Sequence, residues 1–278
     1  MPILRIAILA LSSSAFLIAQ DDAALTAAKA LDQEILKLNT LPHEARPRAI
    51  HDLAVRVRQQ PASDIAALAF NLLAGCGESD GREVLQDIAN TMVEAIHRSP
   101  AEYIAGNMYT ALAELARYGH AEVSLDNPEY AAAVSQLDDN DRRRAGAAFT
   151  LQDIRRQTWD LKGLRGKVVL VNFWSTSCPP CREEMPDLER MYQRFRSQGL
   201  VILAVSGDKA ADLQEYAAAQ KVSFSVLRDP DDKVKEQFRV VGIPKTFLYD
   251  REGRLVGQTL DRPNISGWLE LLRLAGLN

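Results

Sequence analysis

The sequence predicts an α/β domain in its second half, preceded by an all-α domain in its first half. Three observations support this prediction. Apolar residues recur with helical spacing between residues 21 and 120, whereas after residue 149 continuous apolar runs alternate with helical patterns. The polar stretch 126–148 separates the two patterns. Alternating strands and helices are typical of a mostly parallel sheet with helices on both faces.

Composition excludes several classes of protein. The 278 residues leave room for two ordinary domains. Apolar residues make up 47% and charged residues 25%, as in soluble globular proteins. The net charge of -4 gives no basic stripe of the kind that nucleic-acid-binding proteins carry, so we expect no nucleic-acid partner.

Residues 1–19 have the pattern of a secretory signal peptide. Arg5 is followed by an uncharged, largely apolar run over residues 6–19, and polar residues come next. The run is shorter than the roughly 20 apolar residues that span a bilayer. The alternative is an uncleaved anchor, which would be the one membrane attachment of the protein. Either interpretation places the protein outside the cytoplasm, in the periplasm or an equivalent extracytoplasmic space, where disulfides are common.

The first domain, predicted over residues 20–145 with its polar linker, consists of about five helices in a bundle or a short solenoid. No strand pattern occurs in it, and it resembles no known family. The predicted core faces are formed by Ile50, Leu53, Ala54 and Val57, by Ile65, Leu68, Ala69 and Leu72, by Leu85, Ile88, Met92 and Ile96, and by Met108, Leu112 and Leu115.

The second domain, predicted over residues 146–278, contains the strands. The run "KVVLVNFW" is rich in β-branched residues and is typical of a strand buried on both faces. The last two strands flank a short turn containing Gly253, which indicates an antiparallel hairpin at the end of the sheet. Strands are predicted over 167–174, 200–206, 222–227, 246–250 and 254–260, and helices over 181–196, 210–220, 231–238 and 265–274.

The motif "CPPC" carries the predicted chemistry. Cys178 follows the first buried strand and Cys181 opens the next helix. A thiol at the start of a helix faces unpaired amide donors and the positive end of the helix dipole, which favour the thiolate. We therefore expect the more exposed Cys178 to attack a disulfide and the sheltered Cys181 to resolve the resulting mixed disulfide.

Other uses of a cysteine pair fit less well. A zinc site needs about four ligands, and the second half contains no histidine. Covalent haem attachment needs a histidine directly after the second cysteine, where Arg182 stands. A purely structural disulfide would stabilise little across so small a loop. We therefore expect a redox pair that uses no metal and no cofactor.

Beyond the cysteine motif, residues 149–278 resemble the thioredoxin-like thiol-disulfide oxidoreductases, most closely the exported TlpA/ResA type. The matching segments are "GKVVLVNFW", "CPPCREEMP", "DPDDKVKEQF" and "VGIPKTFLYDREGRLVG". The resemblance implies a thioredoxin-like fold. It also implies a cis bond before Pro244 that faces the cysteines, and a substrate groove flanked by Ile243 and Thr246. One departure is Ser177, because the family usually has an aromatic residue there; Trp174 remains nearby and is either a site residue or a core residue.

Glu184 is the third expected catalytic residue. It stands three positions after Cys181 and so lies one turn along on nearly the same helix face. The resemblance implies that it handles protons at the buried cysteine. Asn172 occupies the strand position where thioredoxin has a buried aspartate, which suggests that the acid–base role has moved from strand to helix. The alternative is a solvated first-turn acid that interacts with the helix dipole.

The resemblance implies a reductase acting on disulfide-bearing exported proteins. It further implies cytochrome c maturation as one role and a membrane thiol-electron transporter as the reductant. Two alternatives remain open. The helical half could recruit a partner, which would make the protein a binding or scaffold protein. A thiol peroxidase is disfavoured, because Thr176 does not stand at the spacing that those enzymes share. The remaining Cys76 is expected to be a buried core residue or to form an intermolecular disulfide.

Overall fold

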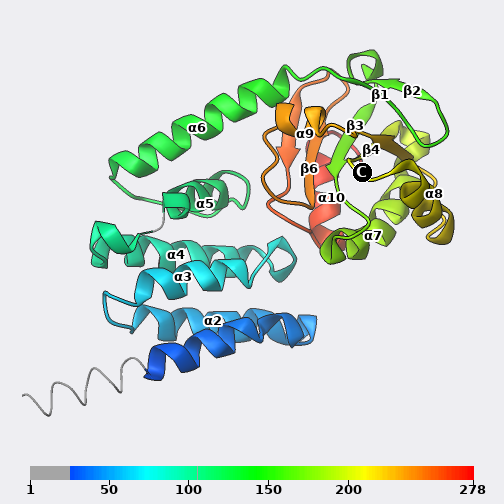
Figure 1. The fold of residues 1–278 in the computed structure, drawn as a ribbon. Helices are drawn as coiled ribbons and strands as arrows, with labels where there is room; N and C mark the ends of the chain where they lie inside the picture. Colours follow the sequence, from blue (N-terminus) through cyan, green and yellow to red (C-terminus); the bar gives the residue numbers. More distant parts are fainter. Residues whose placement is uncertain (1–25, 105) are drawn as a thin grey trace, which may run out of the picture. The chain divides into compact units, whose positions relative to one another are not determined.

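The computed structural model describes residues 26–104 and 106–278 (Figure 1). The predicted signal segment 1–19 lies outside these described residues. The chain divides into two compact units, and the first contains the residues up to Cys76 together with Glu83–Met108. The second contains Gly77–Arg82 and Tyr109–Asn278. Within the described part, no helix is both long and apolar enough to cross a membrane.

The first unit is helical, as predicted. Among the described residues, 26–36 are helical, followed by α2 (Arg46–Arg58), α3 (Ile65–Ala74) and α4 (Arg82–Arg98). The core faces predicted from the 3.6-residue period are all buried, including Ile50 and Met92, which are 0% exposed. Cys76, just after α3, is only half-buried, so the prediction of a fully buried core thiol is wrong.

Two further helices precede the sheet, α5 (Gly106–Arg117) and α6 (Pro128–Ala145). The prediction of an irregular linker over 126–148 is therefore wrong. Asn127 caps α6 by accepting a hydrogen bond from the Tyr130 amide, and Pro128 occupies the first turn, where its missing amide costs nothing. The compact second unit includes α6, while the domain boundary at residue 145 stays a prediction.

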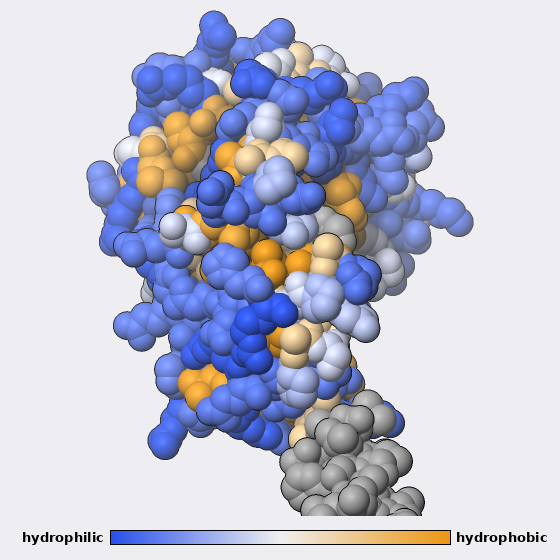
Figure 2. All heavy atoms as spheres, turned by 90° about the vertical axis from the view of Figure 1, so that its left-hand side faces the viewer, coloured by the Kyte–Doolittle hydropathy of each residue, from blue (hydrophilic) through white to orange (hydrophobic). Residues whose placement is uncertain are grey.

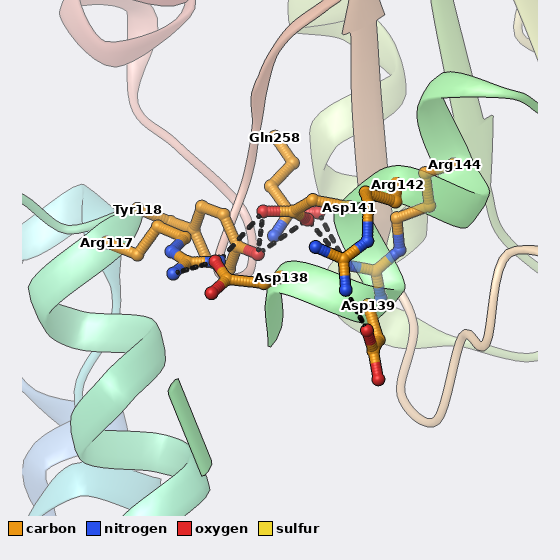
Figure 3. A network of polar contacts seen from close by, with 8 residues as sticks. All are labelled: Arg117, Tyr118, Asp138, Asp139, Asp141, Arg142, Arg144 and Gln258. Atoms are coloured by element: carbon orange, nitrogen blue, oxygen red, sulfur yellow. Dashed lines mark hydrogen bonds and ion pairs between the residues drawn. The ribbon is translucent and has the colours of Figure 1, made fainter. Parts of the chain in front are cut away.

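Charged pairs hold α6 against its neighbours in the second unit (Figure 3). Arg117 of α5 bonds Asp138 at 2.6 Å and Asp141 at 3.2 Å. Arg144 is 4% exposed and donates to the carbonyl of Phe238. Because Asp138, Asp141 and Arg144 have polar partners in tertiary contacts, a segment that is too polar for a core helix by its sequence still packs as one. The remaining contacts in Figure 3 join Tyr118 to Asp141, Arg142 to Asp139, and Arg144 to Asp141 and Gln258.

The central sheet has five strands in the order β5-β4-β3-β6-β7. The strands β3, β4 and β5 are parallel, whereas β6 and β7 run antiparallel to their neighbours. The mostly parallel sheet with a terminal hairpin is thus confirmed. The strands are β3 (Val168–Phe173), β4 (Leu200–Ser206), β5 (Ser225–Arg228), β6 (Lys245–Tyr249) and β7 (Leu255–Gln258). A short hairpin, β1 (Thr150–Gln152) with β2 (Thr158–Asp160), was not predicted.

Helices cover both faces of this sheet, as predicted. One face packs against α7 (Pro179–Phe195), α8 (Ala210–Ala219) and α10 (Ile265–Leu274). The other face packs against α9 (Lys233–Gln237) and the segment before β3, around Phe149 and Leu161. Side chains alternate between the two faces along each strand, which is why Val168 and Val169 lie in different core clusters.

The view in Figure 2 shows a mostly hydrophilic surface on which apolar side chains form small separate patches. Among the described residues, the most exposed large apolar side chain is Val241, in the loop before β6. That loop also contains Ile243 and Pro244, so the exposed valine lies two residues from predicted site residues.

Candidate active site

The cysteine pair lies where β3 ends and α7 begins. Cys178 is the N-cap residue of α7, and its Sγ accepts a hydrogen bond from the Cys181 amide at 3.3 Å. Pro179 and Pro180 fill the first turn, where their missing amides remove no helix hydrogen bond. The two cysteines form a disulfide bond with each other. The Cys181 amide would also stabilise a thiolate at the Cys178 sulfur after reduction.

The two cysteines differ in exposure in the predicted direction. Cys178 is half-buried, whereas Cys181 is 0% exposed and belongs to the core between the sheet and α7. The carbonyl of Ile243 lies 3.8 Å from the Cys178 sulfur, and the peptide bond between Ile243 and Pro244 is cis. The structure thus brings Ile243 and Pro244 to the cysteines, while their substrate role stays a prediction.

Glu184 lies in the first part of α7, one turn beyond Cys181, and is 0% exposed. Its Oε1 accepts a hydrogen bond from the Asn172 side chain at 2.7 Å, and its buried Oε2 has no hydrogen-bond partner among the described residues. Burial raises the pKa of Glu184 to about 8, and the hydrogen bond from Asn172 offsets only part of this rise. The alternative of a solvated first-turn acid is therefore wrong.

Asn172 links Glu184 to another predicted site residue, Thr246. The Asn172 amide also donates to the Thr246 hydroxyl at 3.1 Å, and Thr246 is 0% exposed. In this state Thr246 lies beneath the surface and does not line an open groove. We therefore interpret Thr246 as a support for the Glu184 side chain, and its predicted contact with substrate stays a prediction.

Trp174 is also buried, at 3% exposure, and its ring packs against Tyr216 at a centroid distance of 5.1 Å. Its indole nitrogen is buried with no hydrogen-bond partner within the described ranges. Trp174 shares the core cluster with Cys181 and also lines a cavity of about 360 Å³ together with Ser177 and Ile243. It is therefore both a core residue and a neighbour of the cysteine pair.

Asp208 is a site residue that we did not predict from the sequence. Its Oδ2 accepts hydrogen bonds from the Thr176 amide at 2.6 Å and the Thr176 hydroxyl at 2.8 Å, and the Ser175 hydroxyl lies 3.1 Å away. Although burial pushes the pKa of Asp208 upward, these hydrogen bonds hold it below its ordinary value. Asp208 thus fixes the loop that leads into Cys178. Its position just after β4, at the carboxyl edge of the sheet, could have indicated a site residue from the sequence.

Known proteins resemble the second unit. Residues 143–258 match the AhpC/TSA family. The thiol-disulfide oxidoreductase ResA of Bacillus subtilis (strain 168) is 37% identical over 109 residues, which are 39% of this chain and 61% of that relative. The ResA of Geobacillus kaustophilus (strain HTA426) is 33% identical over 129 residues, which are 45% of this chain and 74% of that relative.

A solved structure, the thioredoxin domain of a thiol-disulfide oxidoreductase from Bacteroides vulgatus, is 30% identical to this chain, with a TM-score of 0.43. The matched region covers 46% of this chain and 94% of the chain in that structure. The sheet order, the helix-capping cysteine pair and the ResA relatives together confirm the predicted thioredoxin-like fold and the predicted enzyme class for this domain. Through this domain, the chain belongs to the family of ResA-type thiol-disulfide oxidoreductases.

Proposed function

We propose that this protein is an exported reductase that transfers electrons from its cysteine pair to disulfides in other exported proteins. The observation that carries the proposal is the asymmetry of the pair. The half-buried Cys178 can meet a client, while the fully buried Cys181 lies one turn from a buried acid, Glu184.

The reaction begins with the reduced pair. The Cys178 thiolate, stabilised by the Cys181 amide, attacks one sulfur of a client disulfide. A mixed disulfide forms, and the other client sulfur leaves as a thiolate that takes a proton from water. The Glu184 carboxylate then accepts the proton of the Cys181 thiol. The Cys181 thiolate attacks the Cys178 sulfur, closes the internal disulfide, and releases the second client thiolate, which takes up that proton. Two electrons and two protons pass to the client.

The pKa of Glu184 suits this step. A carboxyl whose pKa is raised to about 8 is a stronger base, once ionised, than an ordinary glutamate, and its pKa lies close to that of a thiol. An ordinary carboxylate would be a poor acceptor for a thiol proton. The buried acid therefore supports proton transfer at the buried sulfur.

The partners follow from this reaction. Continued turnover needs a donor of two electrons, and we propose a membrane thiol-electron transporter in this role. The proposed clients are disulfide-bearing proteins in the same extracytoplasmic space, with apocytochromes c as one class. Export would depend on residues 1–19, either as a cleaved signal peptide or as an anchor.

Insulin reduction tests the activity. The reduced protein should precipitate the insulin B chain faster than a Cys178→Ser variant, which lacks the attacking sulfur. Equal rates would contradict the proposal. A peroxide-consumption assay run beside it should show no cysteine-dependent activity, and fast consumption would favour a peroxidase instead.

Trapping tests the clients. In a Cys181→Ala variant the mixed disulfide on Cys178 cannot be resolved, so clients should stay attached in the native host. Mass spectrometry would identify them. The capture of exported proteins with disulfides is expected, whereas the capture of cytoplasmic proteins alone would contradict the proposed location.

A further inference from the structure

A short segment from the helical half of the sequence belongs to the redox unit. Gly77–Arg82, which we call the strap, follows α3 along the chain but lies within the second unit. Its attachment to the segment after β7 uses both backbone and side chains. The Glu78 amide donates to Asp261 Oδ1 at 2.9 Å, the Leu260 amide donates to Glu78 Oε1 at 2.7 Å, and Asn264 donates to the Ser79 carbonyl at 3.0 Å.

The strap lies directly on the Asp261 carboxylate. A Cβ atom built on Gly77 would come within 2.1 Å of Asp261 Oδ2, so no larger residue fits without displacing one of the two. Glu78 contributes a second carboxyl group, whose pKa burial raises to about 8 and whose Oε2 is buried with no hydrogen-bond partner in the described part of the chain. Asp261 as a residue is half-buried, but its carboxylate faces the strap.

Hydrogen bonds and an ion pair connect the segment that carries Asp261 to Glu184 and to its neighbour Glu183. On one side, Thr259 and Thr246 exchange hydrogen bonds of 3.0 Å, and Asn172 joins Thr246 to Glu184. On the other side, Arg262 pairs with Glu183, the residue before Glu184, at 2.8 Å. Asp261 lies between these two attachments, so its charge is held at a fixed place near the buried acid.

Electrostatics gives this placement a consequence. Burial raises the pKa of Asp261 to about 6, which leaves the group ionised at neutral pH. After burial itself and the hydrogen bond from Asn172, three charges act on the pKa of Glu184: Arg262 lowers it, and the like-charged Asp261 and Asp187 raise it. Other charges, those of Asp80, Lys245 and Arg262, act on Asp261. Lys245 is in turn affected by Glu114 and Arg144.

We propose that Asp261, covered by the strap, is a positioning residue for the redox reaction: its fixed negative charge disfavours the ionised form of Glu184 and so raises the pH at which Glu184 gives up its proton. The strap contributes by excluding water, since a charge in a water-poor environment acts more strongly on its neighbours. The inference rests on the proposed proton role of Glu184, and it connects the helical part of the sequence to the redox chemistry through six residues.

The pH dependence of the reduction potential tests this inference without any client. The full-length protein would be equilibrated with glutathione buffers between pH 5 and pH 10, and its oxidised fraction measured by alkylation and mass spectrometry. The slope of the potential against pH changes where Glu184 and the two thiols titrate, and the break that Glu184→Gln removes is the one that belongs to Glu184. Asp261→Asn should lower this break, because a like charge is removed. Arg262→Gln should raise it, because an opposite charge is removed.

Two further variants separate the charge from the fold. Gly77→Ala displaces the strap and admits water to Asp261, so the break should also fall. Glu270→Gln removes the 2.6 Å ion pair that ties Arg82 of the strap to α10, but it leaves both carboxylates in place and should not move the break. Thermal unfolding of each variant shows whether it is folded before its potential is interpreted.

Each combination of results leads to a different conclusion about Asp261 and Glu184. If Asp261→Asn alone lowers the break, and Glu184→Gln removes the break so that Asp261→Asn has no further effect in that background, Asp261 acts through Glu184. If Glu184→Gln removes the break but Asp261→Asn alone leaves it in place, the inference is wrong while the proposed role of Glu184 stands. If Glu184→Gln leaves the break unchanged, both are wrong.

Discussion

Two carboxyl groups flank the same cysteine pair, and their environments shift their pKa values in opposite directions. Asp208 lies on the side of Cys178, is partly exposed, and accepts hydrogen bonds from Thr176 and Ser175. Glu184 lies on the side of Cys181, is fully buried, and accepts one hydrogen bond, from Asn172. The pKa of Asp208 lies below its ordinary value, and that of Glu184 is raised to about 8.

The difference shows what decides the charge of a carboxyl group. Burial alone disfavours the ionised form, and each donor that points at the carboxylate favours it. Asp208 has enough donors and enough water to remain ionised, so it can serve as a fixed anchor for the loop. Glu184 has too few of either, so it can exchange a proton near neutral pH. One side of the pair is therefore built for holding geometry and the other for proton transfer.

The largest expected effect comes from removing the exchangeable proton. Glu184→Gln keeps the shape and an acceptor for Asn172 but cannot take the Cys181 proton. We expect the single-turnover reduction of oxidised glutathione at pH 7 to slow by about 100-fold, as is typical of losing a general base. Stopped-flow measurement of the reaction checks this. Glu215→Gln, an exposed glutamate of α8, is the matched control, and equal rates in both variants would contradict the role.

Removing the fixed anchor should affect stability more than chemistry. Asp208→Ala leaves the Thr176 amide and two hydroxyl groups without their charged acceptor, so the free energy of unfolding should fall by about 2 kcal/mol. Urea denaturation at pH 7 measures this. Because the pKa of Asp208 is lowered in the folded state, its contribution is complete above pH 3.8 and is lost as the pH falls through the folded-state value. A loss that persisted unchanged at pH 2 would argue against an ionised anchor.

The contribution of Glu184 to the free energy of unfolding should change with pH in the opposite direction from that of Asp208. Its pKa is about 8 in the folded protein and near 4.5 in an unfolded chain, so between these values the folded state holds more protons. The wild-type protein should therefore lose stability as the pH rises from 5 to 8, by at most about 1.4 kcal/mol per pH unit from this group. In Glu184→Gln the loss of stability over this pH range should be smaller by this contribution, while Glu78 and Asp261, whose pKa values burial also raises, still contribute. Denaturation curves of the wild-type protein and of Glu184→Gln at three pH values measure the difference. The same change of unfolding free energy with pH in both proteins would be inconsistent with a buried protonated acid.

The smallest effect concerns one donor to the anchor. Thr176→Val removes the hydroxyl that donates to Asp208 at 2.8 Å but keeps the backbone amide. The expected loss in the free energy of unfolding is about 1 kcal/mol, less than for Asp208→Ala. If the valine variant lost as much as the alanine variant, the hydroxyl rather than the carboxylate would be the main contributor.

The sequence predicted those features that depend on local pattern. Buried runs such as 167–174 marked the strands, and the capping position of Cys178 followed from its place between a strand and a helix. The position of Glu184 one turn beyond Cys181 followed from helix geometry, whereas its burial was left open by the sequence and is shown by the structure. Predicting these features needs only the spacing of apolar residues along the chain and the chemistry of a helix N-terminus.

The features that were missed depend on contacts between distant residues. Helix α6 looked irregular because its charges find partners only in the folded protein, as Arg117 and Asp138 do. Asp208 is recognisable only when Thr176 lies beside it. The strap is the extreme case, since Glu78 and Leu260 are 182 residues apart in the chain. No single local window contains both members of such a pair.

Carbon-13 NMR titration of the side-chain carboxyl groups in the oxidised protein tests the central contrast most directly, with Glu184→Gln and Asp208→Asn used for assignment. Glu184 should remain protonated at pH 7 and titrate near 8, while Asp208 should stay ionised to below pH 3.8. A Glu184 resonance that titrates near 4.5, alongside an ordinary Asp208, would contradict this account.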